Sequence, residues 1–191
     1  VHNGMINING IKMSKSLGNV WWAKDLIKNH GGNLTRWLMI STHYRAPLNL
    51  NEEAFTTSKK ELDKIAAAYK QACVKLALLD AKEATTFDET YTAFIDALND
   101  DLNTPNAISV VYEVVKKINQ AVRQREIDVE NLSVLVHTLE KMLYILGIEF
   151  EKITMSEEDK EMYQNWRNAV KEKDFETADT LRQTLIEKGI L

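Results

Sequence analysis

The chain has 191 residues, of which 45% are hydrophobic and 27% are charged, with only seven Gly and two Pro. This composition excludes a disordered or collagen-like chain and predicts one or two compact, helix-rich domains. The formal net charge of −4 argues against a nucleic-acid-binding protein, but residues 1–50 hold six Lys and Arg against a single Asp. Such asymmetry indicates that the basic part meets a polyanion, unless it is a chance fluctuation in a small sample.

The first elements predicted along the chain are a hairpin, a polar loop and two short helices. Residues 6–8 alternate apolar and polar side chains and run into Asn9-Gly10, the strongest short-range hairpin signal. Residues 12–19 (KMSKSLGN) are polar and predict an exposed loop or strand exit, which we call the KMSKS loop. A helix is expected over 20–29, followed by a second over 34–43 with Asn33 as its N-cap.

From residue 51 onward, apolar residues recur at spacings of three and four, which predicts amphipathic helices. The apolar positions are Leu62, Ile65, Tyr69, Ala72, Leu76 and Leu79 in the first stripe; Phe87, Tyr91, Phe94 and Leu98 in the second; Ile108, Val111, Val115, Ile118 and Val122 in the third; and Leu132, Leu135, Leu139, Met142 and Leu146 in the fourth. Thr104 is expected to cap the third helix, with Pro105 at its first position, and Gly147 to close the fourth. Four such stripes predict helices packed antiparallel around a shared core.

A final pair of helices is predicted after the bundle, with Ser156 capping one and Asp174 the other. The expected fold is therefore mainly α: a short β-hairpin and the KMSKS loop, then an antiparallel helical bundle, then a C-terminal helical pair. We divide the chain into three parts at residues 1–50, 51–150 and 151–191.

The sequence holds one cysteine, Cys73, which cannot form an internal disulfide and has no cluster of metal-ligating residues near it in sequence. No apolar run approaches the roughly 18 residues that a membrane helix needs, and the first residues do not resemble a signal peptide. We therefore expect a cytoplasmic protein without membrane contact. Because Val1 stands in place of an initiator Met, we expect a fragment of a longer protein.

The candidate catalytic residues are Lys12 and Lys15. Two lysines three residues apart at a mobile hairpin exit can close over a triphosphate and stabilise the charge that accumulates as pyrophosphate leaves, each well-placed donor contributing roughly 3–4 kcal/mol. Ser14 and Ser16 add hydroxyl donors. A Lys-x-x-Lys pair alone is usually a solvated surface stretch, and only the complete string after a hairpin signal favours a nucleotide site.

The string Lys12-Met13-Ser14-Lys15-Ser16, continued by Leu-Gly-Asn, resembles the second signature of class I aminoacyl-tRNA synthetases. Its surroundings are similar to the cysteinyl-tRNA synthetase family in particular. The similar blocks are residues 2–5, 37–49, 99–105 and 173–190. The resemblance thus extends over almost the whole chain.

The resemblance implies an enzyme that activates cysteine with ATP and transfers it to tRNA(Cys), and we expect a monomer. Lys12, Met13, Ser14, Lys15 and Ser16 would bind ATP, presented with Mg²⁺, and Lys15 is the stronger catalytic candidate. The residues that would contact tRNA phosphates, or else are plain surface charges, are Lys24, Lys28, Arg36 and Arg45. The family's Rossmann core, ATP-binding His-Ile-Gly-His signature and zinc site have no counterpart in the sequence. We therefore assign no metal ligand, expect zinc and the cysteine site only in a missing N-terminal part, and expect the fragment alone to be inactive.

Two positions depart from the family pattern. Ile11 stands where the family usually has Glu, and Trp21-Trp22 stands where it tends to have paired Phe; packing of the loop base is the expected role of the tryptophans, with base stacking as the alternative. The family also usually continues beyond Gly189-Ile190, so the anticodon-binding module is expected to be incomplete. Asp100, Asp101 and Asn103 are interpreted as helix-end and turn residues.

Two other functions remain open at this point. One is a related cysteine ligase that couples cysteine to an amino-sugar and keeps the same loop. The other is a non-catalytic helical RNA-binding module. The continuous portion after Arg45, which would face tRNA, and the C-terminal helical pair count against the amino-sugar ligase.

Overall fold

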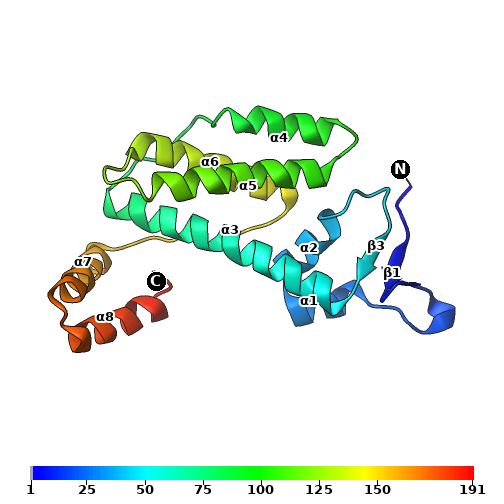
Figure 1. The fold of residues 1–191 in the computed structure, drawn as a ribbon, viewed down its shortest axis with the longest axis horizontal. Helices are drawn as coiled ribbons and strands as arrows, with labels where there is room; N and C mark the ends of the chain where they lie inside the picture. Colours follow the sequence, from blue (N-terminus) through cyan, green and yellow to red (C-terminus); the bar gives the residue numbers. More distant parts are fainter. Residues whose placement is uncertain (1) are drawn as a thin grey trace.

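The structure is a computed structural model that describes residues 2–191; Val1, from which we inferred a fragment, lies outside the described residues. The fold is mainly α, as predicted, with eight α-helices and one small sheet in the described part of the chain. The helix α3 (Glu52–Leu78) runs most of the length of the molecule, with the sheet at one end and the last two helices at the other (Figure 1).

The sheet has three short strands, β1 (Ile6–Ile8), β2 (Ile11–Lys12) and β3 (Leu48–Leu50), in the order β2-β1-β3. The predicted hairpin is confirmed, because β1 and β2 pair antiparallel around Asn9-Gly10. Both turn residues have positive φ, 51° and 79°, as a two-residue hairpin of this type requires. The parallel pairing of β3 on β1 was not predicted, since it joins residues about forty positions apart.

The crossover between β1 and β3 carries α1 (Ala23–His30) and α2 (Gly32–Ile40). The helix expected over 20–29 begins only at residue 23, with Trp21 packing against Phe55 before it starts. The prediction that Asn33 caps the second helix is wrong. Its amide instead donates to the Glu149 carbonyl at 2.7 Å and accepts from the Glu149 N–H at 3.2 Å, so it joins two distant segments.

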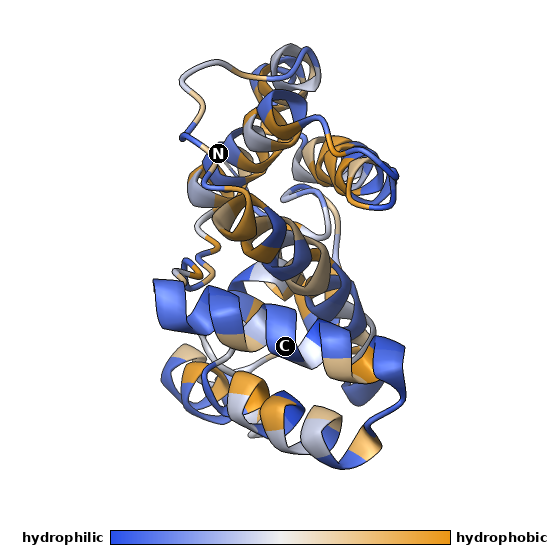
Figure 2. Ribbon diagram, turned by 90° about the vertical axis from the view of Figure 1, so that its left-hand side faces the viewer, coloured by the Kyte–Doolittle hydropathy of each residue, from blue (hydrophilic) through white to orange (hydrophobic). Residues whose placement is uncertain are grey.

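The bundle consists of α3, α4 (Thr90–Asn99), α5 (Thr104–Ala121) and α6 (Val129–Leu146). Its apolar stripes face one another while hydrophilic residues cover the outer faces (Figure 2). The predicted cap of α5 is wrong by one residue: Asn103 accepts from the Asn106 N–H, and Thr104 is the first helical residue. Two stripe residues are exposed, because Leu79 follows the end of α3 and Phe87 precedes α4.

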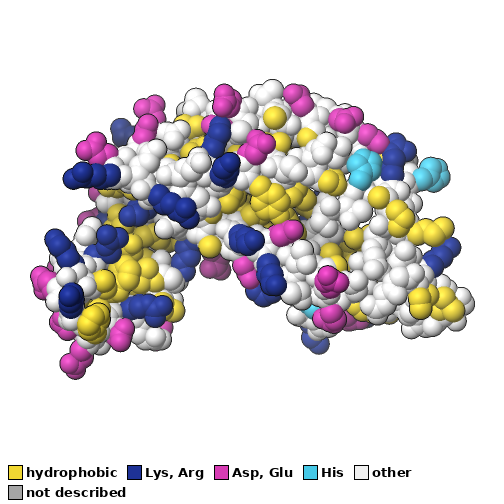
Figure 3. Space-filling view, in the orientation of Figure 1, with side chains coloured by type: hydrophobic (Ala, Val, Ile, Leu, Met, Phe, Trp, Pro, Cys, Tyr) yellow, Lys and Arg dark blue, Asp and Glu magenta, His cyan; other side chains and the backbone are white. Residues whose placement is uncertain are grey.

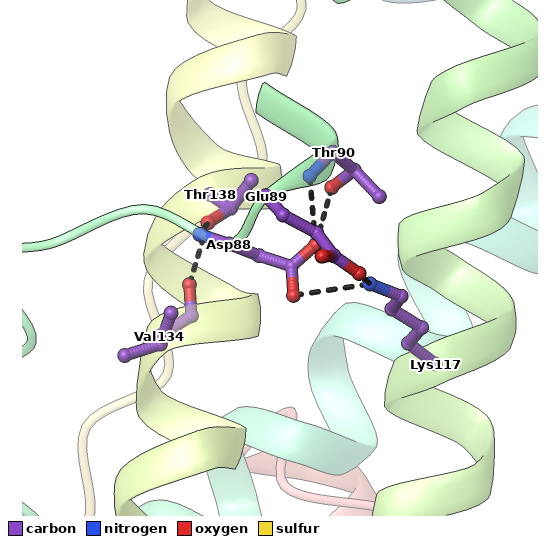
Figure 4. A network of polar contacts seen from close by, with 6 residues as sticks. All are labelled: Asp88, Glu89, Thr90, Lys117, Val134 and Thr138. Carbon is purple, nitrogen blue, oxygen red and sulfur yellow. Dashed lines mark hydrogen bonds and ion pairs between the residues drawn. The ribbon is translucent and has the colours of Figure 1, made fainter. Parts of the chain in front are cut away.

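A polar network fixes the start of α4 to the other helices (Figure 4). Asp88 accepts from the Thr90 N–H and hydroxyl, at 3.0 and 2.6 Å, and from Lys117 Nζ on α5 at 2.9 Å. The Asp88 N–H donates to the hydroxyl of Thr138 on α6, which is fully buried and donates in turn to Val134. Burial alone would raise the pKa of Asp88, but the hydrogen bonds from Thr90 and Lys117 outweigh it and lower that pKa. The network is internally satisfied, so it serves the fold.

The C-terminal pair is α7 (Glu157–Glu172) and α8 (Phe175–Glu187). Both predicted caps are confirmed: Ser156 forms a reciprocal capping box with Asp159, and Asp174 accepts from the Thr177 N–H. None of the helices in residues 2–191 combines the length and apolarity needed to cross a membrane.

Three apolar clusters lie along α3 and correspond roughly to the three predicted parts. Phe55 belongs to the cluster at the sheet, residues 62–73 to the bundle core, and Val74 to a small cluster with Tyr163 and Leu185. Because one helix contributes to all three, the parts share a framework. The division at 50 and 150 itself stays a prediction.

Candidate functional site

The KMSKS loop leaves the hairpin and is closed by one side chain, Asn19. Its amide donates to the Lys12 carbonyl at 3.2 Å and accepts from the Ser14 N–H at 2.9 Å, which joins the two ends of the loop. Between them lies one 3₁₀ turn, Lys15–Leu17, which ends at Gly18 with φ of 69°. The hydroxyls of Ser14 and Ser16 are 2.6 Å apart. The backbone of the loop is therefore ordered by its own residues.

Both lysines of the loop are exposed. Neither takes part in any ion pair formed among residues 2–191, where nine such pairs are present. Lys12 and Lys15 thus combine a fixed backbone with free ammonium groups, an arrangement suited to an anion from outside the chain.

Exposed apolar side chains occur within this loop and next to it in sequence. Ile11, in place of the family's usual Glu, is 60% exposed, and Leu17 and Trp22 are 64% and 54% exposed. Trp21, in contrast, packs on Phe55 at a centroid distance of 6.1 Å, which confirms the packing role for one of the two tryptophans.

The four basic residues expected to meet tRNA phosphates fall into two groups. Arg36 Nε donates to the Leu146 carbonyl at the end of α6, at 2.9 Å, and so caps that helix. Arg45 forms a two-point ion pair with Asp101, at 2.6 and 3.0 Å. Lys24 and Lys28 are exposed on α1 and have no ion-pair partner in the described part of the chain. A role of all four at tRNA stays a prediction.

Asp101 does more than the expected turn residue. It has positive φ, 53°, as a turn residue can, but its carboxylate also accepts from the Tyr44 hydroxyl at 2.6 Å. The hydrogen bond from Arg45, followed by that from Tyr44, lowers the pKa of Asp101 to about 2. Local sequence could not reveal this contact, because the partners lie 56 and 57 positions away.

A second group of cations was missed by the sequence interpretation. Lys75 on α3 and Arg167 and Lys171 on α7 line a groove of about 650 Å³, together with Tyr163 and Trp166. We call it the α3–α7 groove. No carboxylate lines it, and none of its three cations forms an ion pair within residues 2–191. Figure 3 shows Lys and Arg side chains gathered around an apolar surface at the α7 end of the molecule.

Another cavity, of about 400 Å³, lies between α3, α6 and the segment before α7. Most of its charged groups are paired: Glu140 accepts from the Tyr69 hydroxyl at 2.7 Å, Lys152 pairs with Glu83, and Lys160 pairs with Asp80. Burial raises the pKa of the Cys73 thiol to about 11, which keeps it protonated and unreactive. Within residues 2–191, no three His, Cys, Asp or Glu side chains gather where they could hold a metal ion.

Comparison with known proteins shows which class of protein this chain resembles. Over 82% of the chain, the fold matches 24% of the LeuRS of Agrobacterium radiobacter, solved as a ternary complex with tRNA and LeuAMS, at a TM-score of 0.56 and 16% identity. Residues 1–60 match the family described as the catalytic domain of class I (C) tRNA synthetases, and residues 93–151 match the DALR domain. The chain thus carries a KMSKS loop within a segment similar to the catalytic domain of class I tRNA synthetases, followed by a segment similar to the DALR domain.

Relatives that match the whole of this chain indicate which kind of synthetase it resembles. The chain is 36% identical over 198 residues to a cysteine–tRNA ligase of Bacillus cereus, 35% over 195 residues to that of Mesoplasma florum, and 34% over 193 residues to that of Mycoplasma mycoides. Each match covers the whole chain but 43% of the relative. The chain is a homologue of the cysteine–tRNA ligases and corresponds to their C-terminal portion. It spans less than half the length of these relatives.

Proposed function

We propose that this chain is the part of a cysteine–tRNA ligase that supplies the ATP-phosphate loop and the tRNA-binding helices. The whole protein would join cysteine to tRNA(Cys) at the expense of ATP. The observation that carries this proposal is the match of the entire chain to cysteine–tRNA ligases, combined with an ordered KMSKS loop whose two lysines are free. The same match disfavours the amino-sugar ligase and the non-catalytic RNA-binding module.

In the proposed reaction, Lys12 and Lys15 stabilise the negative charge on the departing pyrophosphate, and Met13, Ser14 and Ser16 complete the ATP contact. ATP would enter as its Mg²⁺ complex. Because Asn19 already orders the backbone, the lysines need little reorganisation when the charge develops, which is the condition under which electrostatic stabilisation is most effective. The described residues do not fit the family's zinc site, since no ligand cluster is present among them and Cys73 is buried.

The test is the substitution Lys15→Ala in the intact enzyme. A group that acts mainly in the transition state should, when removed, lower the rate of cysteine activation by about 100-fold or more while cysteine binding stays nearly unchanged. The assay is ATP–pyrophosphate exchange, with cysteine affinity measured separately. Lys59→Ala, an exposed lysine on α3, is the matched control. Equal losses in activation and in cysteine affinity would refute the transition-state role.

We further propose that the chain alone forms no cysteinyl-adenylate. The support is that it spans 43% of the relatives' length, so that most of a ligase lies outside it. Measurable ATP–pyrophosphate exchange by the purified 191-residue chain would overturn this proposal. The cytoplasmic location and the monomeric state stay predictions.

For tRNA, we propose two contact areas: Lys24 and Lys28 on α1, and the α3–α7 groove. The groove joins unpaired cations to the partly exposed ring of Trp166, which is 5.3 Å from Tyr163 in an edge-on arrangement. A positive groove with aromatic side chains is the usual design for holding unpaired nucleotides. The cations would position the RNA without reading its sequence.

This proposal is tested by tRNA(Cys) binding to the chain at several salt concentrations. Replacing the three groove cations by Gln (Lys75, Arg167 and Lys171) should weaken binding and reduce the slope of log affinity against log salt by about two to three. The matched control replaces three exposed lysines on α3 (Lys59, Lys60 and Lys64) by Gln and removes the same charge. Equal effects of the two triple variants would show that only net charge matters, and would contradict a specific groove.

A further inference from the structure

Three consecutive side chains converge on the Asp101 carboxylate. The Tyr44 hydroxyl donates to Oδ1 at 2.6 Å, Arg45 donates through Nε to Oδ2 at 2.6 Å and through Nη2 to Oδ1 at 3.0 Å, and His43 Nε2 lies 3.9 Å from Oδ2. The rings of His43 and Tyr44 are stacked at 4.8 Å, and the Arg45 guanidinium lies over the Tyr44 ring at 5.1 Å. We call this arrangement the Asp101 latch.

On one side, the latch is continuous with the hairpin that carries the KMSKS loop. The Tyr44 carbonyl accepts from the Gly4 N–H at 2.6 Å, and the Leu48 N–H donates to the Met5 carbonyl at 2.9 Å. At the hairpin turn, the Gly10 N–H donates to the Asn49 side chain at 2.8 Å. Residues 44–50 and residues 4–10 are therefore bonded along their length.

The approach of these two segments leaves no free space. A Cβ added at Gly4 would lie 2.1 Å from the Ala46 carbonyl oxygen, so only glycine fits there. A displacement of residues 44–46 must consequently move the start of β1, and with it the hairpin that leads to Lys12.

On the other side, Asp101 belongs to the bundle. It lies in the turn between α4 and α5, where both it and Leu102 have positive φ, 53° and 55°. Backbone hydrogen bonds tie this turn to α4, from the Leu102 N–H to Leu98 at 3.0 Å and from the Asn103 N–H to Ala97 at 3.2 Å. Two non-glycine residues in this conformation persist only where the surroundings hold them.

The rest of the N-terminal part is held to the bundle along α2. Trp37 is buried in the bundle core, Arg36 bonds to Leu146 at the end of α6, and Asn33 bonds to Glu149. The latch is a separate attachment on the side of the sheet. Because its ion pair is largely exposed, 62% at Arg45 and 47% at Asp101, it adds little to stability. What it supplies is orientation of the sheet relative to the bundle.

We propose that Asp101 is a positioning residue of the ligase: through Tyr44 and Arg45 it holds the KMSKS hairpin in a fixed orientation to the α4–α5 turn. The inference rests on the proposed function for its catalytic consequence. When the bundle binds tRNA, the α4–α5 turn and the KMSKS loop move together. The device therefore couples the RNA-binding helices to the step in which Lys12 and Lys15 act.

The first test uses the 191-residue chain and amide hydrogen exchange. Asp101→Asn removes the charge while keeping a residue type that tolerates positive φ. Exchange at Gly4, Gly10 and Leu48 should become about three- to tenfold faster, a range expected for the loss of an exposed two-point ion pair with good geometry. The amides of α6 should exchange as before. Lys59→Gln, which breaks the exposed ion pair with Asp63, is the matched control and should change none of these amides.

Unchanged exchange at Gly4 and Leu48 would overturn the proposal. If the amides of α6 also exchange faster, the Asp101→Asn variant has lost global stability. Tyr44→Phe, which removes only one hydroxyl, is then the deciding variant: exchange at Gly4 and Leu48 should be faster than in the wild type, and unchanged exchange would overturn the proposal. Arg45→Gln should reproduce the effect of Asp101→Asn. The double variant should add nothing to either single one, since both remove the same contact; additive effects would contradict the latch.

The second test uses the intact enzyme. Asp101→Asn should lower kcat for ATP–pyrophosphate exchange by about tenfold and leave KM for cysteine unchanged, because orientation at the reacting centre is lost while the amino-acid site is untouched. An active wild type with an equally active variant would refute the positioning role. A wild type without exchange activity would instead refute the proposed function, and the exchange test on the chain would still decide the latch.

Discussion

Trp37 offers the sharpest test of how the N-terminal part is joined to the bundle. It lies in the segment that matches a catalytic domain, yet it is fully buried in the apolar cluster of the bundle. Its indole N–H donates to Glu61 at 3.0 Å, and its ring meets Tyr112 edge-on with centroids 6.4 Å apart. Trp37→Ala would leave a large cavity and an unpaired carboxylate at Glu61.

The magnitude follows from these contacts. Truncation of a buried Trp to Ala costs about 3–5 kcal/mol of unfolding free energy. Trp37→Phe keeps most of the ring but loses a hydrogen bond to a charged group, which costs about 1.5–3 kcal/mol. Against a typical total of about 5–15 kcal/mol, the Ala variant should be at the edge of stability.

The assay is urea unfolding followed by far-UV circular dichroism, with the slope m checked for constancy. The matched control is Trp22→Ala, a residue of the same segment that is 54% exposed and should change the unfolding free energy by less than about 0.5 kcal/mol. A cost below about 1 kcal/mol for Trp37→Ala would refute the reasoning. So would a separate early transition of the N-terminal part with an unchanged bundle.

Three further predictions concern caps and acid. Ser156→Ala removes the capping box of α7 and should lower the local unfolding free energy of that helix by about 1 kcal/mol. Proteolysis within residues 157–187 should then be faster, and an unchanged rate would contradict the prediction. Gly147→Ala should lower the free energy of unfolding in urea by about 1–2 kcal/mol, because φ is +74° at this position and the added Cβ would lie 3.2 Å from Arg36 Nε. An unchanged free energy of unfolding would show that the turn relaxes without cost. The bond from Lys188, then those from Ser156, hold the pKa of Asp159 at about 2. Because this pKa is depressed on folding, its contribution is complete above the ordinary Asp pKa of about 4 and is lost as pH falls towards 2. The acid sensitivity of Trp166 fluorescence in this window should diminish in Asp159→Asn.

The local elements could be predicted from sequence because their signals are local. Asn9-Gly10 specifies a hairpin through its tolerance of positive φ, and the spacing of three and four specifies the bundle helices through the geometry of one helix face. The KMSKS loop is equally a contiguous string, so its lysines could be selected without any knowledge of the fold. The caps at Ser156 and Asp174 were correct for the same reason.

The sequence-based predictions were wrong or incomplete for side chains whose hydrogen-bond partners lie far away in the sequence. Asn33 has the side chain of a helix cap, but Glu149 presents its backbone there and takes both hydrogen bonds. Arg36 and Arg45 were equivalent to Lys24 and Lys28 as surface cations until the fold supplied the end of α6 and Asp101 as partners.

What the sequence by itself determined is therefore the order of elements, the helix faces and the loop with its two lysines. The tertiary structure alone decided which cations are free, that Lys75 joins Arg167 and Lys171 in one groove, and that Asp101 closes on Tyr44 and Arg45. The physical reason is that periodicity and capping depend on neighbours along the chain. Ion pairing and grooves depend on which elements meet, and here those elements are more than fifty residues apart.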